Sequence, residues 1–228
     1  MEQRIALRQR VGLVLVALAL LLSGYGLWNT TTDAAEATLQ ALAKTAVSSS
    51  DLSKLKTGQI LVTEEESARQ GDLRYVMAKL WINRAPDVVW KNLQDQEGLF
   101  HGEPHMKQVK VVKVLSPKAQ NVAYSLSISR LLPQFDYVTR VNFSDTSRTA
   151  QFERISGSFK SFKGFARLQP VSDKQNGVST VMIYALQLDT GFFVPQFVTR
   201  SVLKGGLPDL MTHIRQQIYK RHPHLQAK

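Results

Sequence analysis

The feature that most constrains the fold is the order of the segments: a strand, a helix, a run of strands, and then one long amphipathic helix. Period-two alternation marks the strands, beginning with LRYVMAKLWI, in which every second residue from Val76 to Ile82 is apolar. A run of strands with one apolar face needs a cover, and the only later element long enough to provide it is that last helix. We therefore expect an α+β fold in which a curved antiparallel sheet wraps around a long C-terminal helix and leaves space between the two.

The remaining segments follow the same two periodicities. Helical spacing in APDVVWKNLQDQEGLF predicts the first helix. Alternation predicts five or six further strands, in MKQVKVVKVLSP, NVAYSLSISRL, QFDYVTRVNF, RTAQFERI, GFARLQP and VSTVMIYALQLD. The last helix carries an apolar stripe from Leu203 to Ile218, and Gly205, Gly206 and Pro208 near its middle predict a kink or a step.

An apolar run without charges, from Val11 to Trp28, follows the basic N-terminus MEQRIALRQR. At ~1.5 Å per residue it reaches about 27 Å as a helix, close to the ~30 Å hydrocarbon core of a bilayer. Three interpretations stay open: an uncleaved membrane anchor, a signal segment cleaved near Gly24-Tyr25-Gly26, and a buried hairpin of core helices. Because the arginines precede the run, the first two place the rest of the chain outside the cytoplasm. In a bacterium this predicts a single-pass inner-membrane protein with a periplasmic domain, or a secreted periplasmic protein after cleavage.

These patterns divide the chain into three parts. Residues 1–28 form the anchor or signal segment, residues 29–58 a linker or stalk, and residues 59–228 the globular domain. The linker is rich in Ala, Ser and Thr. A short helix is predicted from Asp33 to Val47, and SSSD is expected to break it.

Composition limits the partners and the chemistry. The formal net charge is +11, which makes an anionic partner plausible, either lipid headgroups or nucleic acid. The chain has no cysteine, which excludes disulfides, thiolate metal sites and a thiol nucleophile.

The stretch RISGSFKSFKGFARLQP, residues 154–170, combines aromatic, basic and glycine residues. Alternation puts Phe162, Gly164 and Ala166 on one face, while Phe159 breaks the pattern and predicts a turn near Gly157 to Ser161. The stretch is therefore interpreted as a hairpin with an apolar inner face and a basic outer face. A nucleic-acid platform needs aromatic and basic side chains on the same face, and a phosphate loop needs a following helix, so neither is expected.

Evidence for catalysis in the sequence is weak. His101, Glu103 and His105 are close together, but Gly102 and Pro104 predict a loop without a third metal ligand. No Ser-His-Asp order, paired carboxylates or cofactor fingerprint is present. We therefore predict no metal, no cofactor and no catalytic residue, and an enzyme is the less favoured interpretation.

Several motifs, taken in order, resemble a known superfamily. They are Gly164-x-Ala166-x-Leu168-x-Pro170, then TVMIY from Thr180, then DTGFFVP, followed by a terminal amphipathic helix. Together they resemble the START-like superfamily, also called SRPBCC, and within it the polyketide cyclase/dehydrase and coenzyme Q-binding branch, over residues 73–219. The resemblance implies a helix-grip fold with an apolar ligand cavity between the sheet and the last helix. Family members often carry Trp at the position of Ala166, so the smaller residue either enlarges the cavity or repacks it.

The expected function is binding, and possible transport or chaperoning, of a hydrophobic ligand such as a lipid, quinone or isoprenoid. Burying about twelve methylenes is worth on the order of 10 kcal/mol, against association costs of about 4 kcal/mol or more. The candidate cavity residues are the inward-facing apolar side chains: Tyr124, Phe135, Tyr137, Phe143, Phe152, Ala166, Met182, Tyr184, Leu203, Leu207 and Met211.

The sequence also suggests headgroup contacts, alternative functions and partners. Arg130 and Arg154 share the parity of apolar neighbours, so either is a candidate for contact with a ligand headgroup. A cyclase or dehydratase using the same cavity and a noncatalytic envelope interaction module are the alternative functions. The expected partners are a hydrophobic small molecule and the membrane, through the N-terminal helix and the basic surface, with no nucleic acid.

Overall fold

The computed structural model describes residues 41, 46–66, 74–127, 134–173, 177–191 and 196–224. Its elements are α2 (Ser49–Lys56), β1 (Leu61–Glu66), β2 (Arg74–Ile82), α3 (Pro86–Gln94), α4 (Gln96–Leu99), β3 (Met106–Ser116), β4 (Ala119–Leu126), β5 (Phe135–Ser144), β6 (Thr149–Gly157), β7 (Ser161–Asp173), β8 (Gly177–Asp189) and α5 (Gln196–Arg221). The predicted order of strand, helix, strands and final helix is present, and β1 adds an edge strand that the alternation pattern did not identify.

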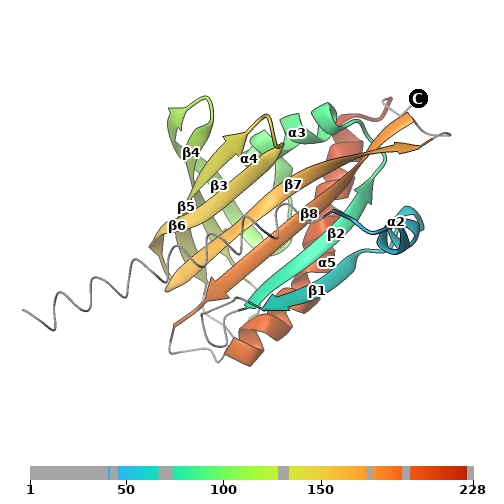
Figure 1. Cartoon of the computed structure of the whole chain (residues 1–228). Coiled ribbons are helices and arrows are strands. Elements are labelled where there is room, and N and C mark those ends of the chain that lie inside the picture. The colour runs from blue at the N-terminus through green and yellow to red at the C-terminus, as the bar shows by residue number, and fades with distance from the viewer. Residues whose placement is uncertain are drawn as a thin grey trace, which may run out of the picture.

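The strands form one 8-stranded sheet in the order β1-β2-β8-β7-β6-β5-β4-β3. Every described pair is antiparallel. The first and last long strands, β2 and β8, are neighbours, so the meander from β3 to β8 returns to the start of the domain. Figure 1 shows the sheet curving around α5. The α+β helix-grip architecture expected from the segment order is therefore confirmed.

The main core lies between the inner face of the sheet and the helices. It contains the alternating residues of β2 from Val76 to Ile82, Val89 and Leu93 of α3, and the α5 stripe that includes Met211. Pro86 stands in the first turn of α3, where its missing N–H costs nothing. Trp90 of α3 fixes that end of the core, because its Nε1 donates to Asp145 at 2.9 Å.

The outer face of the sheet carries a second, smaller core under α2. Leu55 of α2 is fully buried and packs with Met77, Trp81, Phe165 and Ile183. Part of the expected linker is thus a helix packed on the domain. The serines interpreted as a helix breaker are the start of this helix, since the Ser48 side chain accepts a hydrogen bond from the backbone N–H of Asp51 at 3.1 Å.

Helix α5 is continuous from Gln196 to Arg221, so Gly205, Gly206 and Pro208 lie within it without ending it. The predicted step is absent. Glu64 of β1 holds the helix to the sheet edge, through Arg200 at 3.2 Å and Lys204 at 2.6 Å. Among the described residues, no helix is both long and apolar enough to span a membrane; the run from Val11 to Trp28 lies outside those residues.

Candidate ligand cavity

A cavity of about 150 Å³ lies between the inner face of the sheet and the N-terminal half of α5. Its described walls come from α3, α4, the loop before β3, strands β3 to β8 and α5. Engineered cavities of this size admit a single aromatic ring. The cavity reaches the surface beside α5, because Gly206 both lines it and is exposed to solvent.

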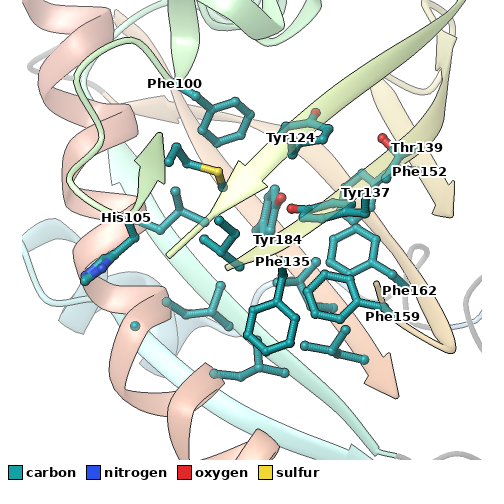
Figure 2. A pocket seen from close by; sticks show the side chains of 18 of the residues that line it. Phe100, His105, Tyr124, Phe135, Tyr137, Thr139, Phe152, Phe159, Phe162 and Tyr184 are labelled. Atoms are coloured by element: carbon teal, nitrogen blue, oxygen red, sulfur yellow. The ribbon is translucent and has the colours of Figure 1, made fainter. Parts of the chain in front are cut away.

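Aromatic rings form much of the wall and contact one another (Figure 2). Tyr137 stacks on Tyr124 with ring centroids 5.1 Å apart, and the ring centroid of Phe159 lies 4.8 Å from that of Tyr137. Phe152 lies 5.4 Å from Tyr184 on the neighbouring side. These contacts fix the rings in place, so the wall is preorganised.

Most of the candidate residues lie in this wall. The structure places eight of them there: Tyr124, Phe135, Tyr137, Phe152, Ala166, Tyr184, Leu203 and Leu207. That they contact a ligand stays a prediction. Ala166 is fully buried opposite Tyr184 in the β7–β8 register and lines the cavity. Its methyl group is small, so it leaves space that a larger side chain would fill.

Three candidates are core residues that do not line the cavity. Phe143 sits at the end of the sheet near α3, where its ring contacts Trp90 edge-on at 6.0 Å. Met182 and Met211 are fully buried in the main core. Their side chains share the inward face, but they stand where helix and sheet pack directly.

Of the two candidate arginines, Arg154 does not lie in the cavity wall, and the prediction for Arg130 is untested. Arg154 is outside the cavity wall and donates from Nη2 to the carbonyl oxygen of Gly157 at 2.9 Å, so it closes the turn after β6. Arg130 lies outside the described residues. No Lys or Arg is among the described residues that line the cavity.

The sequence patterns missed several polar wall residues. Gln96 of α4 accepts a hydrogen bond from the Tyr124 hydroxyl at 2.9 Å. Glu103 is 5% exposed, and its Oε2 accepts from the backbone N–H groups of His105 and Met106 at 2.8 and 2.7 Å. Both Glu103 and His105 line the cavity, although HGEPHM was interpreted as a solvated loop. Burial of this loop depends on α4 and β4, and alternation carries no information about it.

The three wall tyrosines stay protonated. Burial raises the pKa of Tyr124, Tyr137 and Tyr184 well above the ordinary value of a phenol. The pKa of Tyr137 is raised further because its phenolate would be repelled by an ionised Tyr184 and then by the carboxylate of Glu103. Each phenol is therefore a neutral hydrogen-bond donor at physiological pH.

No group of three or more metal-ligating side chains is found in the described part of the chain. Glu103 and His105 line the cavity, but no third metal-ligating side chain joins them among the described residues. One carboxylate oxygen of Glu103 already accepts hydrogen bonds from two backbone N–H groups. The described wall is mainly apolar, and its polar side chains supply a few hydroxyl, amide, carboxylate and imidazole groups.

Comparison with known proteins supports the fold. No protein-family model and no curated protein matches the chain. Among solved structures, it is similar to a STAR-related lipid transfer protein from Xanthomonas axonopodis, with 16% identity and a TM-score of 0.58 over 70% of this chain and 93% of that one. Human STARD10 matches at 15% identity and a TM-score of 0.55, over 80% and 86% of the two chains.

A third similar structure is the Zhui aromatase/cyclase from a Streptomyces species, with 13% identity and a TM-score of 0.57 over 65% of this chain and 95% of that one. At these identities the likeness shows the fold alone. The chain thus has the START-like fold that the sequence motifs resembled.

Proposed function

We propose that this protein binds a hydrophobic small molecule in the cavity between the sheet and α5. The observation that carries the proposal is an apolar, ring-lined cavity of about 150 Å³ that opens at Gly206. Proteins with the same fold include a lipid transfer protein and an aromatase/cyclase, whose names indicate hydrophobic or polyketide-like ligands. An interaction module would fill this space with its own side chains, so the cavity argues against that alternative.

The size of the cavity limits how a ligand is held. About 150 Å³ takes one ring or a short branched segment, so a second fused ring or a longer chain would extend into the mouth beside α5. Burying such a ring is worth about 2 to 3 kcal/mol by transfer alone, and chain contacts at the mouth add to it. Binding by this route needs no catalytic group.

The two adjacent glycines of α5 give a matched test. Gly206 lines the cavity and Gly205 does not, and a Cβ at either position would meet nothing within 4 Å. We expect Gly206→Phe to block the mouth and lower the occupancy of a copurifying apolar ligand at least about tenfold, which corresponds to ~1.4 kcal/mol. Gly205→Phe should retain the ligand. Native mass spectrometry of the full-length chain, with lipid extraction, measures both.

The same experiment can contradict the proposal. Since both substitutions replace a helical glycine by the same residue, effects on helix stability are shared and cancel in the comparison. An equal loss of bound ligand in both variants would show that the ligand does not enter the cavity beside Gly206. A wild-type protein that carries no ligand and takes up no added lipid or quinone would refute hydrophobic binding altogether.

A cyclase or dehydratase activity is the second candidate, because Glu103 and His105 place titratable groups in the cavity wall. It predicts turnover of a polyketide-like substrate that Glu103→Gln abolishes while binding persists. Binding without any product, measured by mass spectrometry over hours, would exclude this function for the substrates tested.

We also propose that the domain works outside the cytoplasmic membrane, close to anionic lipid. Support comes from the apolar run after a basic N-terminus and from the net charge of +11. The edge strand β3 adds exposed Lys110 and Lys113 beside Val112 and Val114, which are 51% and 69% exposed. Protease treatment of bacterial spheroplasts expressing the full chain tests this; a domain protected until the cells are lysed would contradict it.

A further inference from the structure

The hydroxyls of two cavity-lining tyrosines form no hydrogen bond with any residue that the structure describes. Tyr137 of β5 is 4% exposed and Tyr184 of β8 is 8% exposed, and Figure 2 shows their hydroxyl groups pointing toward one another. No hydrogen bond joins either hydroxyl to a residue that the structure describes, whereas the hydroxyl of Tyr124 donates to Gln96 at 2.9 Å.

The hydroxyls of Tyr137 and Tyr184 face the cavity, so a molecule bound there can accept their hydrogen bonds. Almost all buried polar groups in folded proteins are hydrogen-bonded, and leaving one unpaired costs as much as a lost hydrogen bond. Burial keeps both phenols protonated, because it raises the pKa of Tyr137 and Tyr184. The pair therefore offers two O–H donors to one place in the cavity.

The charge of the wall determines which acceptor fits. Among the described lining residues there is no Lys or Arg, and the carboxylate of Glu103 is close enough to Tyr137 to raise its pKa. An anionic headgroup would meet no Lys or Arg among the described lining residues and would lie near the negative charge of Glu103, which is unfavourable in a buried site. A neutral carbonyl oxygen accepts two hydrogen bonds through its two lone pairs and carries no such cost.

The position of the pair also fits a ring. Tyr137 and Tyr184 come from strands on opposite sides of β6 and β7, and their rings are held by Tyr124 at 5.1 Å and Phe152 at 5.4 Å. A planar molecule that fills a cavity of about 150 Å³ would contact these aromatic faces while its oxygen meets the hydroxyls.

We propose that Tyr137 and Tyr184 form a two-donor site for the neutral carbonyl oxygen of a ring-containing apolar ligand, and that the cavity discriminates against carboxylates and phosphates. This inference rests on the proposed binding function and deepens it, by naming the ligand class and the residues that select it. Neutral cyclic ketones and quinones satisfy it, whereas fatty acids and anionic lipid headgroups do not.

Three probes of similar size test the inference: menadione, which carries two ring carbonyls; methylnaphthalene, which lacks them; and naphthoate, which carries a carboxylate. Binding is measured by equilibrium dialysis on the full-length chain in phosphatidylcholine nanodiscs, with empty nanodiscs as the blank. We expect menadione to bind about tenfold more tightly than methylnaphthalene, as two neutral hydrogen bonds allow, and naphthoate to bind most weakly.

The variants then assign the preference to the two phenols. Tyr137→Phe and Tyr184→Phe should each lower the menadione-to-methylnaphthalene affinity ratio about threefold, and the double variant should remove the preference. Tyr75→Phe is the matched control, because this buried hydroxyl also has no partner among the described residues but does not line the cavity, so the ratio should not change. A ratio taken within one variant is independent of how much of that variant is folded.

The outcomes separate the two proposals. If methylnaphthalene binds and menadione shows no preference, or if naphthoate binds as tightly as menadione, the carbonyl site is refuted while hydrophobic binding stands. If Tyr75→Phe lowers the ratio as much as Tyr137→Phe does, the assignment to the cavity pair is refuted. If none of the three probes binds, the proposed function fails as well.

Discussion

Replacing Gly157 with alanine is expected to lower the free energy of unfolding by about 3 kcal/mol or more. Gly157 ends β6 with φ of 112°, a backbone conformation that costs an L-residue about 1 to 3 kcal/mol. A Cβ there would also collide with the carbonyl oxygen of Asp136 and with Cα of Tyr137. Both are backbone atoms of the paired strand β5, so the overlap cannot be relieved by rotating a side chain.

The consequence extends to the cavity, because Gly157 is the register partner of Tyr137. Any shift of β5 that accommodates the methyl group moves this wall tyrosine and its hydroxyl. We therefore expect Gly157→Ala to weaken menadione binding as well as stability, even in the fraction that remains folded.

Gly205→Ala provides the control for the effect of a glycine substitution itself. Gly205 lies within α5 and a Cβ there meets nothing within 4 Å, so alanine should raise stability by about 0.5 to 1 kcal/mol. Urea denaturation of the full-length variants, followed by circular dichroism, measures both changes. Gly157→Ala within about 0.5 kcal/mol of the wild type would contradict the strain argument.

Alternation in the sequence predicted which side chains face the helix, because period two leaves no freedom once one face is apolar. This is why Tyr124, Tyr137 and Tyr184 were identified from the pattern alone and why Phe162 and Ala166 were correctly placed on one face. The same rule explains the turn around Phe159, which is 1% exposed and lines the cavity after the positive-φ Gly157.

A side chain that faces inward does not necessarily line the cavity, and the sequence pattern does not distinguish the two cases. Phe143 and Met182 have the parity of the wall residues, but α3 and α5 approach the sheet closely at their positions and fill the space. The distance between helix and sheet along each strand depends on curvature and on the long-range packing of α5. No local pattern encodes that distance, so core and cavity residues look alike in the sequence.

Contributions from outside the strands were missed for a related reason. Glu103 and His105 reach the cavity from the loop that joins α4 to β3, and Leu55 reaches the outer core from a segment interpreted as a linker. Their burial follows from which elements lie above them in the fold. The one local signal available was Ser48, a good N-cap residue that marks the start of α2.

Alkaline pH is expected to destabilise this protein steeply, starting near pH 10. Burial raises the pKa of four tyrosines: Tyr75, which also lies near the charge of Glu153, and the cavity residues Tyr124, Tyr137 and Tyr184. In the unfolded chain a phenol titrates near pH 10, but in the folded protein these four keep their protons to higher pH. Above pH 10 the native state thus binds more protons than the unfolded state, so stability falls as pH rises.

The magnitude follows from the number of tyrosines. Each contributes a slope of about 1.4 kcal/mol per pH unit between its unfolded and folded pKa, so four together lower the free energy of unfolding by roughly 5 kcal/mol per pH unit. Below about pH 9 they should contribute no pH dependence. Urea denaturation at a series of pH values from about 9 to about 11 gives the slope directly.

Phenylalanine variants separate the tyrosines from the lysines, which also begin to titrate in this range. Tyr75→Phe should reduce the slope by about 1.4 kcal/mol per pH unit, and the triple change of Tyr124, Tyr137 and Tyr184 to phenylalanine by about three times as much. Because a single-residue variant leaves every lysine in place, the difference in slope belongs to the phenol alone. Identical slopes for the wild type and the triple variant would show that the cavity phenols ionise in the folded protein, and hence that water or another polar partner solvates them there.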